Sequence, residues 1–492
     1  MAANQKPQNG KPQTAKSQNG KSQNGKAQNG PLRAITMGGG GPAAGLHIGV
    51  LDALAEANIT FNVWSLSCIG AWVGIVYNAS GKEKENDKTK LSDKEIEKAK
   101  VKATYEFFKN GVFRDDEGYK RFPINTVFGP DWRTNIDAFN KFVSDPKNYR
   151  EFQWQPYRMF DYIQDSMSIV FNQMPRGKKK PFKKLDEGDL NRWILNQVMA
   201  PNPFVRYLTS LMYLSKFNGL SRINYPDSEF MKKIDFDKLK RPDRFIFHNA
   251  WDLESDELAF FANHETDILD KLDENKGPAK RYKGPITAES LCACSALPFI
   301  EETVEIDGTT YCEGALVDTV NFEGLADFKV GGRPLDEIWI SRIVDSKQIR
   351  KPENLHDALA NLCQLFAASV GEDDVKLFKY HVKCDDPRKW SGTVVEIHVP
   401  GHINFKWNHS NLDKGRELGR RSAQHAIDKY LGEDEAVRAH REAVAKAIAQ
   451  DRELPEPKFI NDKPEKDEEY QDIQALCARL RKADERESRE QP

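Results

Sequence analysis

A run of four glycines, Gly38–Gly41, constrains the fold more than any other feature of the sequence. The apolar segment LRAITM precedes it from Leu32, and a helical pattern follows it from Ala44 to Ala57. This order predicts a strand, a tight glycine loop and a helix. In such an arrangement the backbone N–H groups converge at the helix N-terminus, where they bind a phosphate or an oxyanion. The segment is therefore a candidate anion or oxyanion site.

The same alternation of strand and helix continues after the loop. The apolar run ITFNVWSLSC is followed by the helix-like stretch IGAWVGIVYNA, which ends near Ala79. The order β, α, β, α predicts a parallel sheet covered by helices, a three-layer α/β/α fold. Later segments complete the sheet: we expect strands at 244–253, 257–262, 336–344 and 393–399, a hairpin turning at Asp307-Gly308, and helices at 352–370 and 413–431.

Changes in composition divide the chain into three parts. Residues 1–31 repeat QNGK units without any acidic residue, which predicts a disordered basic low-complexity tail. Residues 32–432 are expected to form the α/β domain, with a large helical insertion at about 80–240. Residues 433–492 are dominated by charge and predict a solvated helix to 450, then a mostly flexible segment with a short helix near 471–482.

Overall charge and cysteine usage limit the classes of function. The chain has 73 basic and 75 acidic residues, a balance that excludes a surface dedicated to coating nucleic acid. Its seven cysteines form no CxxC pair and no cluster at zinc spacing, which is typical of reduced thiols in the cytoplasm. The sequence has no uninterrupted stretch of about 18 apolar residues, the length that a membrane-spanning helix requires. We therefore expect a cytoplasmic protein whose contact with a membrane, if it has any, is peripheral.

The glycine loop alone fits two further interpretations. Gly39, Gly41 and Ala44 satisfy a loose GxGxxA dinucleotide pattern, but that fold needs an acidic residue at the end of the second strand to bind the ribose. The sequence has Trp64-Ser65-Leu66-Ser67 there, which argues against a nucleotide. A tight packing turn without any ligand is the other alternative.

Four segments together carry a resemblance to a known family. GGGPAAGLHIGVL (39–51) and FNVWSLSCIGAWVGIVYNAS (61–80) are similar to the glycine-rich loop and the nucleophile elbow of the patatin-like phospholipase family. RFIFHNAWDLESDELAFF is similar to a central strand pair around Asp252-Leu253. PITAESLCACSALPFIEETVEIDGTTYCEGALVD contains Glu313-Gly314-Ala315 where the family has DG[GA]. The resemblance covers about residues 32–345.

The resemblance implies an acyl hydrolase that acts on lipid or other acyl esters without a metal or organic cofactor. The family pairs a serine nucleophile, in the motif GxSxGA, with the aspartate of DG[GA]. The matching positions here are Cys68 and Glu313, and Gly70 matches the elbow glycine. The backbone amides of Gly39–Gly41 would form the oxyanion hole.

Several residues depart from the family pattern. A thiol ionises near pH ~8.5, and the helix N-terminus at Cys68 would lower that pKa, whereas a negative charge on Glu313 would raise it. Leu66 replaces the first elbow glycine and would relax the strained turn or displace the loop. Ala43 and Ala44 replace the basic residue and the glycine of the loop. Two hypotheses remain: a thiol-based hydrolase, or a catalytically inactive patatin fold that binds lipid or a protein.

Other candidate residues near the motifs favour structural roles. Ser65 and Ser67 lie outside the elbow register, and His47 is expected to be a packed histidine rather than a base for Cys68. Asp318 is the fallback carboxylate, but its position five residues after Glu313 predicts that it points elsewhere. Three cysteines close to the second motif are interpreted as packing residues rather than redox partners of the nucleophile: Cys292, Cys294 and Cys312.

The inserted region contains the only hints about a surface for the substrate. RGKKKPFKK (176–184) is strongly basic, and NPFVRYLTSLMYLSKF (202–217) has an apolar stripe at helical spacing. A basic loop beside an amphipathic helix suits an anionic membrane or a lipid droplet. A solvated loop and a core helix explain the same pattern, so both interpretations stay open. The oligomeric state cannot be inferred.

Overall fold

A computed structural model describes most of the chain outside the N-terminus and the inserted region. The described residues are 30–80, 92–118, 128–130, 132–146, 205, 207–209, 219–223, 230–273, 277–322, 325–344, 349, 351–352, 355–385, 390–400, 404, 406–462 and 468–490. Leu32–Pro492 form one compact unit, and Met1–Pro31 form another. The predicted disordered tail lies outside the described residues, as do the basic segment 176–184 and most of 202–217.

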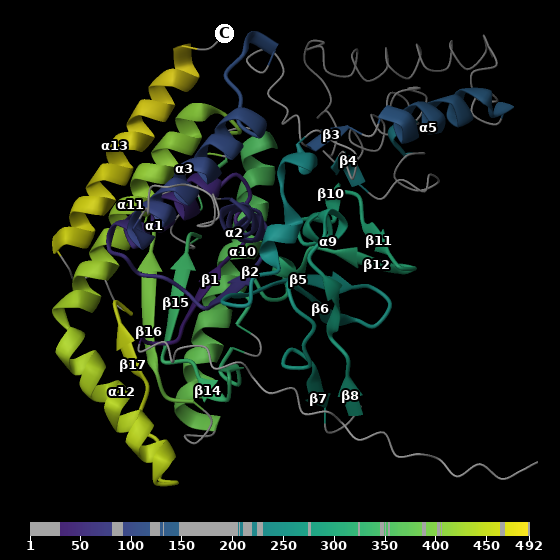
Figure 1. The fold of residues 1–492 in the computed structure, drawn as a ribbon. Helices are drawn as coiled ribbons and strands as arrows, with labels where there is room; N and C mark the ends of the chain where they lie inside the picture. The colour runs from purple at the N-terminus through teal and green to yellow at the C-terminus, as the bar shows by residue number, and fades with distance from the viewer. Residues whose placement is uncertain are drawn as a thin grey trace, which may run out of the picture. The chain divides into compact units, whose positions relative to one another are not determined.

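A mixed ten-stranded sheet forms the centre of the Leu32–Pro492 unit (Figure 1). Its main path runs β11-β12-β5-β2-β1-β15-β16-β17, and β6 and β9 extend it from β5. The six strands from β5 to β17 are parallel to one another, whereas β6 and β12 pair antiparallel with β5. The bounds are β1 Arg33–Met37, β2 Val63–Leu66, β5 Phe245–Asp252, β6 Glu257–Ala262, β9 Tyr282–Pro285, β11 Val304–Ile306, β12 Thr309–Cys312, β15 Glu337–Arg342, β16 Thr393–His398 and β17 Lys458–Ile460.

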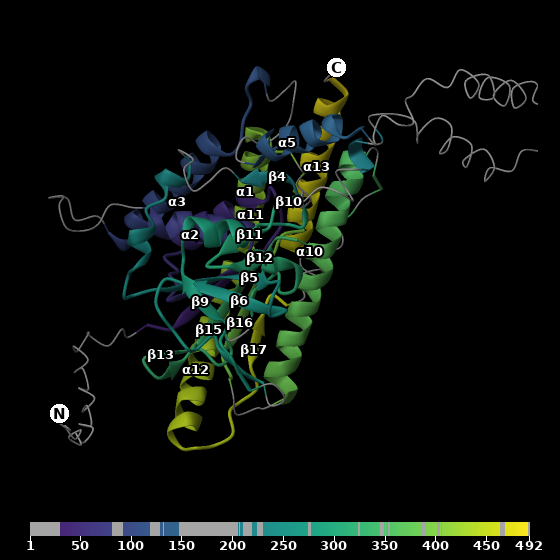
Figure 2. The ribbon, with the colours of Figure 1, turned by 90° about the vertical axis from the view of Figure 1, so that its right-hand side faces the viewer.

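Helices cover both faces of this sheet. Successive side chains of a strand point to opposite faces of the sheet, so alternate strand residues belong to two different cores. Ile35 of β1 packs with α1 (Ala44–Glu56), α2 (Ile69–Ala79) and α11 (His409–Gly432). Ala34 faces the other core, which includes Val375 of α10 (Leu355–Tyr380). Figure 2 shows α10 on the side of the sheet opposite α1 and α11. The predicted three-layer α/β/α fold is confirmed.

Helices α1 and α11 approach so closely that their backbones touch. A Cβ atom on Gly49 would lie 2.0 Å from the carbonyl oxygen of Arg416, and one on Gly419 would lie 2.0 Å from that of Leu46. Both distances are shorter than any real Cβ contact. Glycine at these positions therefore allows α11 to lie directly on the helix that begins at the glycine loop.

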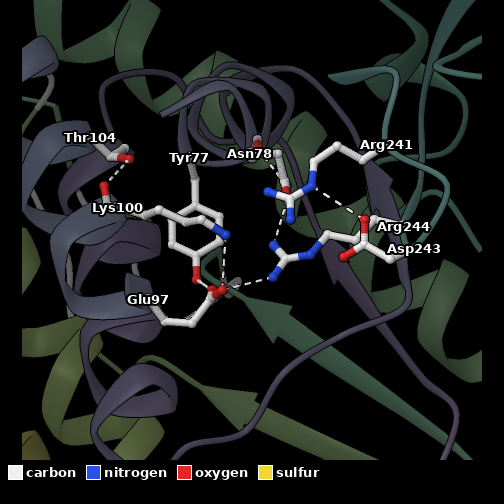
Figure 3. A network of polar contacts seen from close by, with 9 residues as sticks. Tyr77, Asn78, Glu97, Lys100, Thr104, Arg241, Asp243 and Arg244 are labelled. Atoms are coloured by element: carbon white, nitrogen blue, oxygen red, sulfur yellow. Dashed lines mark hydrogen bonds and ion pairs between the residues drawn. The ribbon is translucent and has the colours of Figure 1, made fainter. Parts of the chain in front are cut away.

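A buried polar network fixes α3 (Asp93–Gly111) beside the C-terminal end of α2 (Figure 3). Arg244, just before β5, donates to Glu97 and to Asn78, each at 2.8 Å, and Lys100 donates to Glu97 at 2.9 Å. The Tyr77 hydroxyl also donates to Glu97. Burial alone would raise the pKa of Glu97, but Arg244 and Lys100 hold it down to about 2. These contacts anchor the end of α2 remote from the elbow.

The described parts of the inserted region are only partly helical. Besides α3 and α5 (Trp132–Ser144), they include β3 (Phe128–Pro130) and β4 (Gly219–Ile223). These strands form a small separate sheet with β10 (Phe299–Glu301). The prediction of a helical insertion is therefore incomplete, because strands of three and five residues are too short to produce a clear periodic signal. Among the described residues, no helix combines the length and the apolar character needed to cross a bilayer.

The described parts after residue 450 contain more regular structure than the sequence predicts, and the short helix expected near 471–482 occurs within a longer one. The solvated helix occurs as α12 (Asp434–Ala449), but β17 then pairs in parallel with β16, and α13 spans Glu468–Glu490. Ile460 is buried in the core, and Tyr470 of α13 contacts the His425 ring of α11 at 6.0 Å between centroids. The high charge of the segment obscured its few apolar anchors.

The contact between α1 and α11 gives a test of the fold. We expect Gly49→Ala to lower the free energy of unfolding by about 1–3 kcal/mol, because the added methyl group collides with backbone atoms that cannot rotate away. Gly432→Ala is the matched control, since a Cβ there meets nothing within 4 Å. Urea denaturation measures both variants. Equal stability of the two would contradict the close contact.

Candidate active site

Two strands that run toward each other along one edge of β5 bring the candidate residues together. β2 runs parallel to β5 and ends opposite His248, and β12 runs antiparallel to β5 and ends opposite Trp251. β6 occupies the other edge of β5 over this length. The residues after β2 and β12 therefore reach the same short stretch of β5. These residues are Cys68 and Glu313.

Cys68 lies in a strained turn between β2 and α2. Its backbone has φ 46° and ψ −122°, an unfavourable conformation for a residue with a side chain, and it caps the N-terminus of α2. Gly70 makes the turn possible, because a Cβ there would lie 2.1 Å from the Met37 carbonyl oxygen. The Cys68 thiol is buried, and it lies close enough to the Glu313 carboxyl group for each to shift the pKa of the other. This arrangement has the form of a nucleophile elbow with an adjacent base.

Leu66 does not relax the elbow, contrary to the expectation from sequence. Its side chain is fully buried and lies over Gly74 of α2, where an added Cβ would be 2.6 Å from a Leu66 methyl carbon. The missing side chain at position 74 provides the space that Leu66 occupies. The strained conformation of Cys68 is retained as a result.

The glycine loop lies directly against Cys68. A Cβ on Gly39 would lie 3.1 Å from the Cβ atoms of both Cys68 and Ala315. The Gly39 amide donates to the carbonyl oxygen of Thr319 at 3.2 Å, so it is already used within the protein. In the described part of the chain, no hydrogen bond uses the amides of Gly40 and Gly41. These two amides are therefore available to an oxyanion, unlike that of Gly39.

His47 supports this loop from behind. It is fully buried, with Nε2 2.9 Å from the Gly38 carbonyl oxygen and Nδ1 3.0 Å from the Ser341 hydroxyl. Burial lowers the pKa of His47 to about 4, so the ring is neutral at pH 7. Because the carbonyl needs a donor, Nε2 carries the proton and Nδ1 accepts from Ser341. The residue is packed, in line with the sequence interpretation.

Burial dominates the electrostatics of the pair. It raises the pKa of Glu313 to about 7, although the hydrogen bond from Cys68 lowers it in part. The pKa of the Cys68 thiol is raised well above its usual range by burial and by the adjacent Glu313 and Cys294. The Ile69 amide at the helix N-terminus does lower the thiol pKa, as expected from the sequence, but burial outweighs this contribution and the net shift is upward. At pH 7 the thiol is protonated and about half of the Glu313 groups are ionised.

The comparison with known proteins agrees with this geometry. The family model of patatin-like phospholipases matches residues 35–326, which include the glycine loop, the elbow and Glu313. The chain belongs to the patatin-like phospholipase family. Among solved structures, VipD from Legionella pneumophila is similar, with 10% identity, a TM-score of 0.28, and coverage of 86% of this chain and 77% of that chain. No curated protein matches.

The patatin-like site is surrounded by further thiols. The Cys68 amide donates to the sulfur of Cys294 at 3.1 Å, and charge on Glu313 contributes to the raised pKa values of Cys294, Cys312 and Cys363. Six cysteines are free thiols: Cys68, Cys292, Cys294, Cys312, Cys363 and Cys477. In that part, no group of three or more His, Cys, Asp or Glu side chains is arranged to hold a metal.

The remaining sequence candidates lie around the site and have structural contacts. Ser65 donates to the carbonyl oxygen of Asn321, and Ser67 donates to the Asn249 side chain at 2.8 Å. The Asp318 carboxyl group accepts from the backbone amide of Asn321 at 2.5 Å. Asp252 is at the far end of β5, where it accepts from Lys283 at 2.9 Å and from the next turn.

The contact between Leu66 and Gly74 is testable by a double-mutant cycle. We expect Gly74→Ala to destabilise the protein by about 1–3 kcal/mol, because the methyl group enters the space filled by Leu66. Leu66→Ala together with Gly74→Ala should cost less than the sum of the two single changes. Chemical denaturation of the four proteins gives the coupling. Simple additivity would mean that Gly74 does not accommodate Leu66.

Proposed function

We propose that the protein hydrolyses lipid or other acyl esters through an acyl-enzyme on Cys68. The observation that carries this proposal is the position of the buried Cys68 thiol beside the Glu313 carboxyl group, at a strained elbow and against a glycine loop. Membership in the patatin-like phospholipase family supports the class of reaction. Neither metal nor organic cofactor is needed, and a cytoplasmic location with peripheral contact at a membrane belongs to the same proposal.

In the first half of the reaction, the Cys68 sulfur attacks the carbonyl carbon of the ester. The ionised Glu313 accepts the thiol proton as the bond forms, because the thiol itself is not ionised beforehand. The amides of Gly40 and Gly41 donate to the oxyanion. When the tetrahedral intermediate collapses, the proton on Glu313 passes to the departing alcohol, and a thioester on Cys68 remains.

In the second half, water hydrolyses the thioester. Glu313 accepts a proton from the attacking water, and the same amides stabilise the second oxyanion. The carbon–sulfur bond then breaks, the sulfur recovers its proton from Glu313, and the carboxylic acid leaves. The net change is addition of one water to the ester, and both protein residues return to their starting state.

A patatin fold that binds lipid or a protein without hydrolysis is the second candidate. The raised pKa of the Cys68 thiol favours it, since a buried, protonated thiol is a weak nucleophile. The two candidates differ in whether replacement of Cys68 changes the rate of ester hydrolysis.

A set of substitutions at the pair tests the mechanism. We expect Cys68→Ala to lower turnover of aryl esters by at least about 1,000-fold, because the nucleophile is lost. Cys68→Ser should be poor, since Glu313 is placed for a larger and more acidic sulfur. Adding Glu313→Asp to Cys68→Ser restores the family's residue pair and should recover activity, a non-additive effect typical of residues that act together.

The assay compares wild type with these variants at matched concentration, with folding checked by circular dichroism. Cys477→Ala is the control for loss of a thiol, because Cys477 lies on α13. If wild type and Cys68→Ala hydrolyse equally slowly, the binding protein without catalysis is the better description.

The raised pKa of Glu313 predicts the pH dependence. Because the ionised carboxylate is the base, kcat/KM should rise with pH and approach its plateau above pH 7, falling about tenfold for each unit below it. Glu313→Gln should remove this limb along with most of the activity. Steady-state rates from pH 5.5 to 8 measure this pH dependence of kcat/KM in both proteins. A rate that instead follows a thiol ionising well above pH 8 would mean that Glu313 is not the base.

A further inference from the structure

Two carboxyl groups lie together behind the glycine loop. Asp374 of α10 and Asp318 of the segment after Glu313 accept from neighbouring amides of one turn; Asp318 is buried and Asp374 is half-buried. Burial and then the charge of Asp318 raise the pKa of Asp374, because adjacent carboxylates repel each other, so the pair holds one proton at pH 7. Asp374 lies outside residues 35–326, and the proposed mechanism does not use either group.

The pair holds a turn of four residues, 319–322. The Asp374 carboxyl group accepts from the amides of Thr319 at 2.9 Å and Val320 at 3.3 Å. The Asp318 carboxyl group accepts from the amides of Asn321 at 2.5 Å and Phe322 at 3.3 Å. Four consecutive backbone N–H groups therefore depend on two carboxyl groups that share one proton.

This turn contacts both halves of the candidate site. The Thr319 carbonyl oxygen accepts from the Gly39 amide at 3.2 Å, and the Asn321 side chain donates to the Leu66 carbonyl oxygen at 2.9 Å. The first contact fixes the glycine loop, and the second fixes the end of the strand that leads into the elbow. The Asp374 carboxyl group is thus connected to the Gly39 amide through a single residue, Thr319.

We propose that Asp374 is a positioning residue for the oxyanion loop, and that the proton it shares with Asp318 keeps the loop in place. Loss of that proton leaves two adjacent negative charges, which separate α10 from the turn and release Gly39. The effect of Asp374 on catalysis rests on the proposed function. Its effect on the position of the loop does not.

The pH range follows from the surroundings of the pair. Burial, and next the charge of Asp318, raise the pKa of Asp374 to about 8, so the shared proton is present at pH 7 and lost above pH 8. The other titratable groups on neighbouring elements have partners of their own. Glu372 pairs with Arg342 at 3.2 Å, Asp373 with Lys376 at 3.3 Å, His47 with Gly38, and Glu313 with Cys68.

The first test is the alkaline limb of the pH profile. In wild type, kcat should fall about tenfold from pH 8 to pH 9.5 with little change in KM, because the loop acts on the oxyanion rather than on substrate binding. Asp374→Asn keeps an acceptor for Thr319 and a donor for Asp318, so it should abolish this fall. Asp374→Ala should lower kcat at every pH. Asp373→Asn, an exposed neighbour on α10, is the matched control and should keep the wild-type profile.

The second test does not depend on catalysis. Hydrogen exchange is measured by mass spectrometry on the peptide 37–46 at pH 7 and pH 9, with exposure times scaled for the intrinsic effect of pH. In wild type and in Asp373→Asn, exchange of this peptide should accelerate at pH 9, and in Asp374→Asn it should not. If Asp374→Asn and wild type respond equally to pH, the positioning role is overturned. If no protein hydrolyses esters but the exchange behaves as expected, only the proposed function fails.

Discussion

The shared edge of β5 is the constraint on which the candidate site depends. β2 reaches this edge from one direction and β12 from the other, and both stop before they meet. The short gap between them is where Cys68 and Glu313 face each other. A Cβ on Gly314 would lie 2.9 Å from the backbone of Ala250 on β5, so the residue after Glu313 must be a glycine for the chain to pass this close. The site is therefore a consequence of strand pairing, and the side chains come from segments that are far apart in sequence.

Residues beyond the matched region 35–326 complete the domain. β15, β16 and β17 extend the parallel sheet from β1, and α11 lies on α1 with contacts between backbones. Because α1 begins at the glycine loop, the position of that loop depends on α11 on one face of the sheet. On the other face it depends on α10, which holds the turn at Thr319. A loop of consecutive glycines has little conformational preference of its own, so these external contacts define its shape.

The sequence predicts the alternation of strands and helices, the elbow and the glycine loop, because each depends on local patterns. β6 occurs at the expected residues, and α10 starts as expected but extends beyond residue 370. Contacts between distant residues could not be predicted. From the sequence alone, Leu66 indicates a relaxed turn. The structure shows that Gly74 lies beneath Leu66 and leaves space for its side chain. Asp374 lies in the acidic stretch Glu372-Asp373-Asp374, which is typical of a solvated helix face, and only the tertiary fold brings one of these carboxyl groups next to Asp318.

Burial raises the pKa of both members of the candidate pair, with opposite consequences for catalysis. It raises the pKa of Glu313 toward that of a thiol, which makes the carboxylate a stronger base than it would be in water. It also raises the pKa of Cys68, which makes the thiol harder to ionise. Transfer of the proton before attack is therefore unfavourable, and transfer during attack is the route that avoids a buried thiolate beside a carboxylate. In that route the negative charge moves from Glu313 to the oxyanion as the sulfur bond forms. In the mechanism proposed above, the glycine amides are the groups that receive this charge.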